Sequence, residues 1–167
     1  MRYWWVSASE NSEGGWHWGY FFQNPRSGKR WGGPEWIRST LSHKNIRRIR
    51  QGDLVTAYQA KEGIVGLARF ASDGYQSTSG ADYDMFDLDR QPVLALKQRV
   101  PLDTIRMLPH SKTTIQFVRV LRGTVFEVKA LGFERIVGLL LAFNPGQARQ
   151  IAAFLSKTRV KLPYRIA

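Results

Sequence analysis

Tryptophans placed beside basic residues are the side chains of this chain that could recognise a ligand. All six tryptophans lie at or before Trp36, and Trp31 stands in the basic, glycine-rich stretch 29–34. An aromatic ring can stack on a nucleic-acid base, which contributes about 1–3 kcal/mol per base in proteins that bind single strands. A base flipped out of a duplex is held in the same way, between aromatic side chains. The pattern predicts that Trp31 stacks on a base, with Trp36 as a second candidate.

Some of these tryptophans have a purely structural alternative. Trp4, Trp5, Trp16 and Trp18 could fill a hydrophobic core, and for Trp4 we expect that role. Trp31 differs, because a basic, glycine-rich loop seldom buries a core tryptophan. For Trp36 both roles stay open.

Patterns that would indicate catalysis are weak. His17, His43 and His110 are isolated and lack the spacing of metal ligands, and the chain has no cysteine. The sequence has no phosphate-binding glycine loop of the Walker or dinucleotide type. We therefore expect no catalytic residues, no metal site and no cofactor, and a binding module in place of an enzyme. A nuclease or transferase stays as an alternative, because active sites assemble in space.

The charge of the chain points to a polyanionic partner. The sequence has 25 Lys and Arg against 13 Asp and Glu, a formal net charge of +12. Such a balance is typical of nucleic-acid binding, although a merely basic soluble protein is the alternative. Basic residues are concentrated in residues 26–50 and again in 97–122. Acids gather in residues 73–89, and because they would repel phosphate we expect this segment to lie away from the binding face or to form a mobile loop.

The first basic stretch supplies the candidate phosphate ligands, although each single charge could instead belong to a solvated helix face. The candidates are Lys29, Arg30, Arg38, Lys44, Arg47 and Arg48. No stretch approaches the roughly 20 apolar residues that a membrane helix needs. We expect no signal sequence, because Met1-Arg2 leads directly into Tyr3-Trp4-Trp5 without an apolar signal core. We expect no membrane partner and a cytoplasmic location.

The expected elements fit one domain over residues 1–167. Strands are expected over residues 3–8, 16–23, 54–58, 64–70, 92–100 and 115–121, and helices over 36–50, 102–107, 131–143 and 146–155. The stretch 36–50 is expected as two short helices or as a helix with a kink near Ser42, because the apolar period breaks there. Turn signals at Gly52-Asp53 and Glu62-Gly63 make 54–70 a hairpin. Alternation places Ile64, Gly66, Ala68 and Phe70 on one face. Small residues there could let a ligand approach the backbone, or could mark a tight packing contact.

Several of these stretches together resemble the EVE family, a branch of the PUA-like superfamily related to the YTH readers of methylated adenine. The resemblance rests on Tyr3-Trp4 in the opening strand and on the tryptophan-bearing loop 31–36. It continues through the helix end and turn at 46–53, the strand 54–58, which ends in Tyr58, and Ile64-Val65-Gly66.

The resemblance implies an α+β fold with a small, closed PUA-like β-barrel flanked by helices. It also implies a pocket for a flipped, modified base, such as methylated or hydroxymethylated cytosine in DNA. By position, Trp31 or Trp36 would be a wall of an aromatic cage, Tyr58 would line it and Ser9 would belong to the same pocket. DNA is favoured over RNA as the partner, and a separately encoded nuclease or modification enzyme is a candidate partner. The alternative is a PUA-like RNA-binding protein that acts in RNA modification or translation without such a cage.

Overall fold

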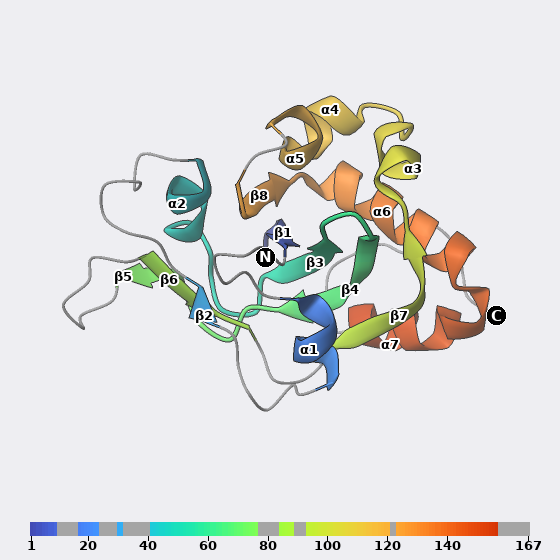
Figure 1. The fold of residues 1–167 in the computed structure, drawn as a ribbon, viewed down its shortest axis with the longest axis horizontal. Coiled ribbons are helices and arrows are strands. Elements are labelled where there is room, and N and C mark those ends of the chain that lie inside the picture. The colour runs from blue at the N-terminus through green and yellow to red at the C-terminus, as the bar shows by residue number, and fades with distance from the viewer. Residues whose placement is uncertain are drawn as a thin grey trace.

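A five-stranded mixed sheet forms the centre of the computed structural model, which describes residues 1–9, 17–23, 30–31, 41–76, 84–88, 93–120 and 123–156 (Figure 1). Its strands are β1 (Tyr3–Ala8), β3 (Leu54–Gln59), β4 (Gly63–Arg69), β7 (Leu94–Val100) and β8 (Val125–Val128). They lie in the order β7-β4-β3-β1-β8. The first strand pairs with β3 in parallel and with β8 in antiparallel register. The predicted hairpin is confirmed as β3 and β4, which pair antiparallel.

The closed barrel expected from the family resemblance is wrong. The sheet is open: among the described strands, β7 pairs with β4, β8 pairs with β1, and the two edge strands do not pair with each other. A second sheet has the order β2-β6-β5 and consists of β2 (Arg30–Trp31), β6 (Asp84–Asp87) and β5 (Tyr75–Gln76). The α+β composition itself stands.

Side-chain amides explain why the edges do not need a closing strand. At β7, the amide oxygens of Gln147 and Asn144 accept hydrogen bonds from the backbone nitrogens of Lys97 and Gln98, each at 2.7 Å. At β8, the Gln116 Oε1 atom accepts from the backbone nitrogen of Glu127 at 2.9 Å. An unpaired strand edge exposes backbone donors and acceptors that need partners. These side chains supply such partners without another strand.

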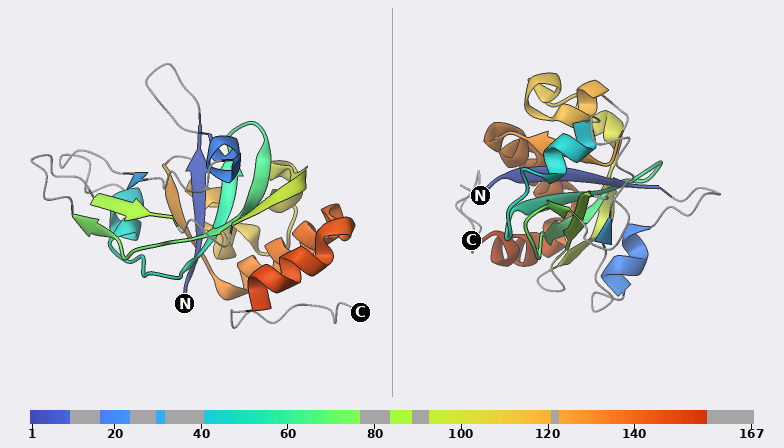
Figure 2. Two further views of the ribbon diagram at one scale, coloured as in Figure 1. Left: turned by 90° about the horizontal axis from the view of Figure 1, so that it is seen from below. Right: turned by 90° about the vertical axis from the view of Figure 1, so that its left-hand side faces the viewer.

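Helices surround the sheet (Figures 1 and 2). They are α1 (Trp18–Gln23), α2 (Leu41–Ile46), α3 (Leu102–Arg106), α4 (Ser111–Thr114), α5 (Gln116–Val120), α6 (Ala130–Phe143) and α7 (Ala148–Ser156), with a 3-10 turn at Pro145–Gln147. The predictions of α3, α6 and α7 are confirmed. The strands expected over 16–23 and 115–121 are wrong, since α1 and α5 form there. For residues 36–50 the sequence predicts two short helices or a helix with a kink near Ser42, and the described part of this stretch contains one short helix, α2.

Two hydrophobic clusters lie on opposite faces of the sheet. Leu54 and Tyr58 belong to the cluster that α3 and α5–α7 cover, while Val55 and Ala57 belong to the other. In β4 the pairing shifts at Val65, so that the period of two is interrupted. Consequently Ile64 and Leu67 face the first cluster, whereas Ala68 and Phe70 face the second. The expected common face of residues 64–70 is wrong for Ile64.

Gly66 of β4 permits close packing of its neighbours. A Cβ atom added to Gly66 would collide with the Phe22 ring and with the carbonyl oxygen of Leu94. Phe22 comes from α1 and Leu94 from β7, so Gly66 lets a helix and a strand approach β4 closely. Of the two interpretations of this glycine, the packing contact is the one that the structure supports.

Candidate nucleic-acid interface

A cavity of about 380 Å³ opens where the parallel strands β1 and β3 end. We call it the Tyr58 cavity. Ser7 of β1 stands directly beside Tyr58 of β3 in the strand register, so both strands deliver side chains to the same end of the sheet. The described residues that line the cavity are Ser7, Ala8, Ser9, Tyr58, Ala60, Leu102, Arg106, Phe117, Gly123 and Thr124. Segments far apart in the sequence therefore build one site.

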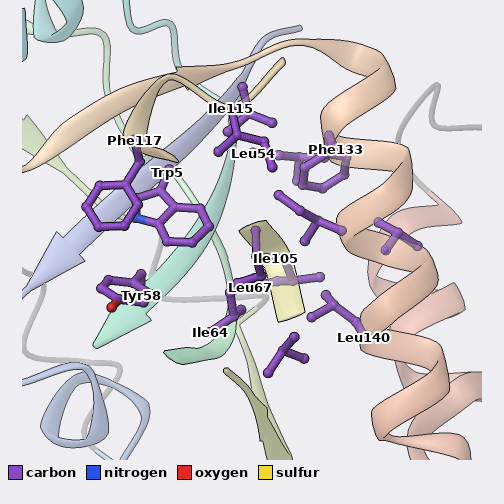
Figure 3. Close-up of a cluster of buried hydrophobic side chains, with 14 of the residues drawn as sticks. Trp5, Leu54, Tyr58, Ile64, Leu67, Ile105, Ile115, Phe117, Phe133 and Leu140 are labelled. Atoms are coloured by element: carbon purple, nitrogen blue, oxygen red, sulfur yellow. The ribbon is translucent and has the colours of Figure 1, made fainter. Parts of the chain in front are cut away.

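Two aromatic residues of the cavity lining, Tyr58 and Phe117, pack against the buried ring of Trp5 (Figure 3). The ring centroids of Trp5 and Phe117 lie 4.7 Å apart in a stacked arrangement, and the Tyr58 centroid lies 4.8 Å from Trp5 and 5.0 Å from Phe117. Trp5 is fully buried, while Tyr58 and Phe117 keep 7% and 6% of their surface exposed. Mutual packing fixes the rings in place, so a planar ligand would meet a rigid aromatic surface.

The polar groups of the cavity are mostly hydrogen-bond donors. The Ser7 Oγ atom accepts a hydrogen bond from the Trp5 indole at 3.1 Å, which leaves the serine proton to donate. Arg106 is held by Asp103, with Nη1 and Oδ1 3.0 Å apart. Burial raises the pKa of Tyr58, against a lowering effect of Arg106 and a further raising effect of Asp103. The phenol is therefore neutral and can also donate.

Comparison with known proteins identifies the family. The model of the EVE domain matches residues 2–139 of the chain. The chain belongs to the EVE domain family. That match spans the Tyr58 cavity and all five strands of the central sheet. No curated protein matches the sequence.

Solved structures share the fold of this EVE domain. Human THYN1, in complex with DNA that contains 5-methylcytosine, is 15% identical with a TM-score of 0.67, over 84% of this chain and 98% of that one. Rpa0253 from Rhodopseudomonas palustris is 24% identical with a TM-score of 0.64, over 87% and 94%. Atu2648 from Agrobacterium tumefaciens is 19% identical with a TM-score of 0.67, over 84% and 93%.

The structure of the EVE domain brings two of the four predicted pocket residues together, since Ser9 and Tyr58 both line the cavity. Trp31 is described by its backbone alone, which lies in β2 and pairs with Phe86 of β6. Its side chain lies outside the described residues, as does all of Trp36. The roles of these four residues in base binding stay predictions.

Sequence reasoning missed Arg106 and Phe117, although both line the cavity. Arg106 belongs to the second basic stretch, 97–122, and that position was a signal by which the sequence could have identified it. Phe117 gave no such signal, because the strand expected at residues 115–121 assigned no position in space to its ring.

Three of the predicted phosphate ligands lie on or just after α2. Lys44, Arg47 and Arg48 are exposed. The Arg48 guanidinium makes two hydrogen bonds to the carboxylate of Glu127, at 3.0 and 3.1 Å, and lies 6.0 Å from the centroid of the Trp4 ring. Lys29 and Arg38 lie outside the described residues, and Arg30 is described by its backbone alone. The predicted function of all six in phosphate binding stays a prediction.

A buried amide attaches α2 to the rest of the interface. The Asn45 Nδ2 atom donates to Gln116 Oε1 at 2.8 Å and to the Val125 carbonyl oxygen at 2.9 Å. These contacts place the basic helix α2 against α5 and β8. The basic residues of 41–50 therefore lie next to α5, which carries Arg119 of the second basic stretch, a proximity that the chain order alone does not show.

Of the predicted acidic cluster, the described part includes the side chains of Asp73 and Asp87. Asp73 accepts a hydrogen bond from the backbone nitrogen of Gln51 at 2.7 Å, and Asp87 lies in β6 of the second sheet. Neither lines the Tyr58 cavity. Within the described ranges, no helix is both long and apolar enough to cross a membrane.

Proposed function

We propose that this EVE domain binds DNA and takes one flipped, modified base, such as methylated cytosine, into the Tyr58 cavity. The observation that carries the proposal is the cavity itself: about 380 Å³ of space against a rigid aromatic wall at the end of the sheet. Enzymes and readers that extrude a base hold it in such a pocket by stacking and by hydrogen bonds to its edge.

The lining of the cavity suits a base better than an apolar or cationic ligand. Tyr58, Ser7 and Arg106 offer donors, and the ring nitrogens and carbonyl oxygens of a base are acceptors. The aromatic rings offer a stacking surface, while Ala8, Ala60 and Leu102 offer apolar contacts for a methyl group. A base with a substituent on its ring could use all three kinds of contact.

Charge supports a nucleic-acid partner in addition. The formal net charge of +12 would attract a polyanion from a distance. The similar structure of human THYN1 is a complex with DNA that contains 5-methylcytosine, which favours DNA over RNA for this chain. The cavity favours a base reader over the alternative of a PUA-like RNA-binding protein without a cage.

We propose further that the protein acts by binding and that a separately encoded nuclease or modification enzyme performs any chemistry. The described lining contains no carboxylate and no histidine, the side chains most often used to move protons in hydrolysis. Hydroxyl groups and a guanidinium held by Asp103 suit recognition.

Fluorescence anisotropy with matched oligonucleotides tests the proposal. DNA and RNA strands with one cytosine, either methylated, hydroxymethylated or unmodified, are titrated with the wild-type protein and with the Arg106→Ala variant. Loss of a hydrogen bond from a charged group costs about 1.5–3 kcal/mol, so we expect Arg106→Ala to bind the preferred strand at least tenfold more weakly. Lys97→Ala, an exposed change on β7, is the control. Equal affinity of the wild type for all cytosine forms would contradict the proposal.

A further inference from the structure

A second hollow, of about 410 Å³, lies beside α5. We call it the α5 groove. Its described lining residues are Lys112, Thr113, Thr114, Gln116, Arg119, Glu127 and Lys129. They come from α4, from α5, from β8 and from the residue before α6, and none of them lines the Tyr58 cavity.

The groove and the Tyr58 cavity share α5 as a partition. Phe117 lines the cavity, whereas its neighbour Gln116 and the later Arg119 line the groove. A helix with its side chains is about 10–12 Å across, so the groove and the cavity are separated by about that distance. A few nucleotides of one strand can span it. A ligand long enough to pass over α5 could occupy both.

The groove has an excess of positive charge. Lys112, Arg119 and Lys129 are exposed cations on its lining. The one acid in the described lining, Glu127, is bound by Arg48 through two hydrogen bonds of 3.0 and 3.1 Å. Because Arg48 neutralises that carboxylate, the three cations determine the electrostatic field of the groove, and this field attracts anions.

Hydrogen bonds within the protein already use the amide oxygen of Gln116 and the hydroxyl protons of Thr113 and Thr114. The Gln116 Oε1 atom accepts from Asn45 and from the backbone of Glu127, so the amide nitrogen is the polar group that remains on this side chain. The hydroxyls of Thr113 and Thr114 donate to the carbonyl oxygen of His110, at 3.0 and 2.9 Å. Cations and an amide donor are the groups that bind phosphate oxygens.

We infer that the α5 groove holds the sugar-phosphate backbone next to the base that enters the Tyr58 cavity. The inference rests on the proposed function and adds a site to it. Asn45 and Arg48 attach α2 to this region, so Lys44 and Arg47 extend the same basic surface. Phosphate contacts of this kind fix the register of a nucleic acid and leave the reading of the base to the cavity.

A pair of matched double variants tests the inference. Lys112→Ala/Arg119→Ala removes two exposed cations from the groove, and Lys97→Ala/Arg149→Ala removes two exposed cations from β7 and α7, which lie away from α5 in Figure 1. Affinity for modified and unmodified oligonucleotides is measured across a salt series. The slope of log K against log salt is negative, and each lost phosphate contact reduces its magnitude by about 0.7–0.9.

We expect the groove variant to lose affinity equally for modified and unmodified strands, with a slope shallower by about 1.4–1.8 if both cations contact phosphate. The control variant should keep the wild-type slope. If the groove variant keeps that slope while the wild type prefers the modified strand, the groove inference is wrong and the proposed function stands. If the groove variant has the shallower slope but the wild type shows no base preference, the groove is a phosphate site and the base-reading function is wrong.

Discussion

The indole nitrogen of Trp4 donates a buried hydrogen bond to Asp53 Oδ2 at 2.9 Å. The same carboxylate accepts from the backbone nitrogens of Arg2 and Arg50, at 2.8 and 3.0 Å. Gly52, just before it, has a φ of +83°, a conformation that glycine adopts without strain. The Tyr3-Trp4 and Gly52-Asp53 motifs are therefore one structural unit, which joins the start of β1 to the start of β3.

Removal of this unit should destabilise the protein. Asp53→Ala leaves the Trp4 N–H buried without its acceptor, which costs about 1–3 kcal/mol, and Trp4→Ala should cost about 3–5 kcal/mol through the cavity it leaves. Urea unfolding of both variants measures these losses. An unfolding midpoint for Trp4→Ala equal to that of the wild type would show that Trp4 has no core role.

Trp31→Ala should have the opposite profile. If the side chain is a wall of the base pocket, its removal should lower affinity by about 1–3 kcal/mol and leave the melting temperature unchanged. The loss should be greater for the modified base than for its unmodified parent, because phosphate contacts survive the change. A protein that melts early but binds normally would assign Trp31 to the core, and an effect on neither property would transfer the role to Trp36.

Tyr58→Phe should separate the hydroxyl of Tyr58 from its ring. The ring packs on Trp5 and Phe117, so the fold should survive, while the loss of one hydrogen bond to the base should weaken binding by about 0.5–1.5 kcal/mol. Anisotropy with the preferred oligonucleotide measures the change, and Tyr75→Phe, at an exposed position in β5, is the matched control. Unchanged affinity of Tyr58→Phe would remove this hydroxyl from the recognition contacts.

Alkaline pH should weaken the fold through the same residue. Burial raises the pKa of Tyr58 above its ordinary value of 10.0, so the unfolded chain releases this proton at a lower pH than the folded protein. Stability from this difference is fully present below pH 10 and is lost as pH rises through the folded pKa. Urea unfolding from neutral pH to above pH 10 should therefore show a smaller decline for Tyr58→Phe. An equal decline in both proteins would contradict this.

The Arg48–Glu127 pair should control the charge of the α5 groove. Arg48→Ala leaves the Glu127 carboxylate uncompensated in the groove lining, so binding of nucleic acid should weaken. Glu127→Gln, added to Arg48→Ala, should restore most of the affinity, because it removes the repulsion. If the double variant binds as weakly as Arg48→Ala, then Arg48 itself contacts phosphate, as the sequence predicts.

Local patterns of the sequence were sufficient for the elements whose periodicity and turns agree. The hairpin of β3 and β4 follows from alternation between two turn signals, and α6 follows from a long apolar segment that Asn144-Pro145 ends. The short segments were ambiguous, because five or six residues rich in aromatic and branched side chains fit a strand or a helix equally well. α1 and α5 are both of this kind.

The sequence by itself determined the family, the basic character and the core role of Trp4, since these depend on residue types and local order. Tertiary structure decided that the sheet stays open, because Asn144, Gln147 and Gln116 satisfy the strand edges from distant positions. It also decided where the Tyr58 cavity lies. Arg106 and Phe117 are 48 and 59 residues after Tyr58, and only packing of α3 and α5 against the end of β3 brings them to the same cavity.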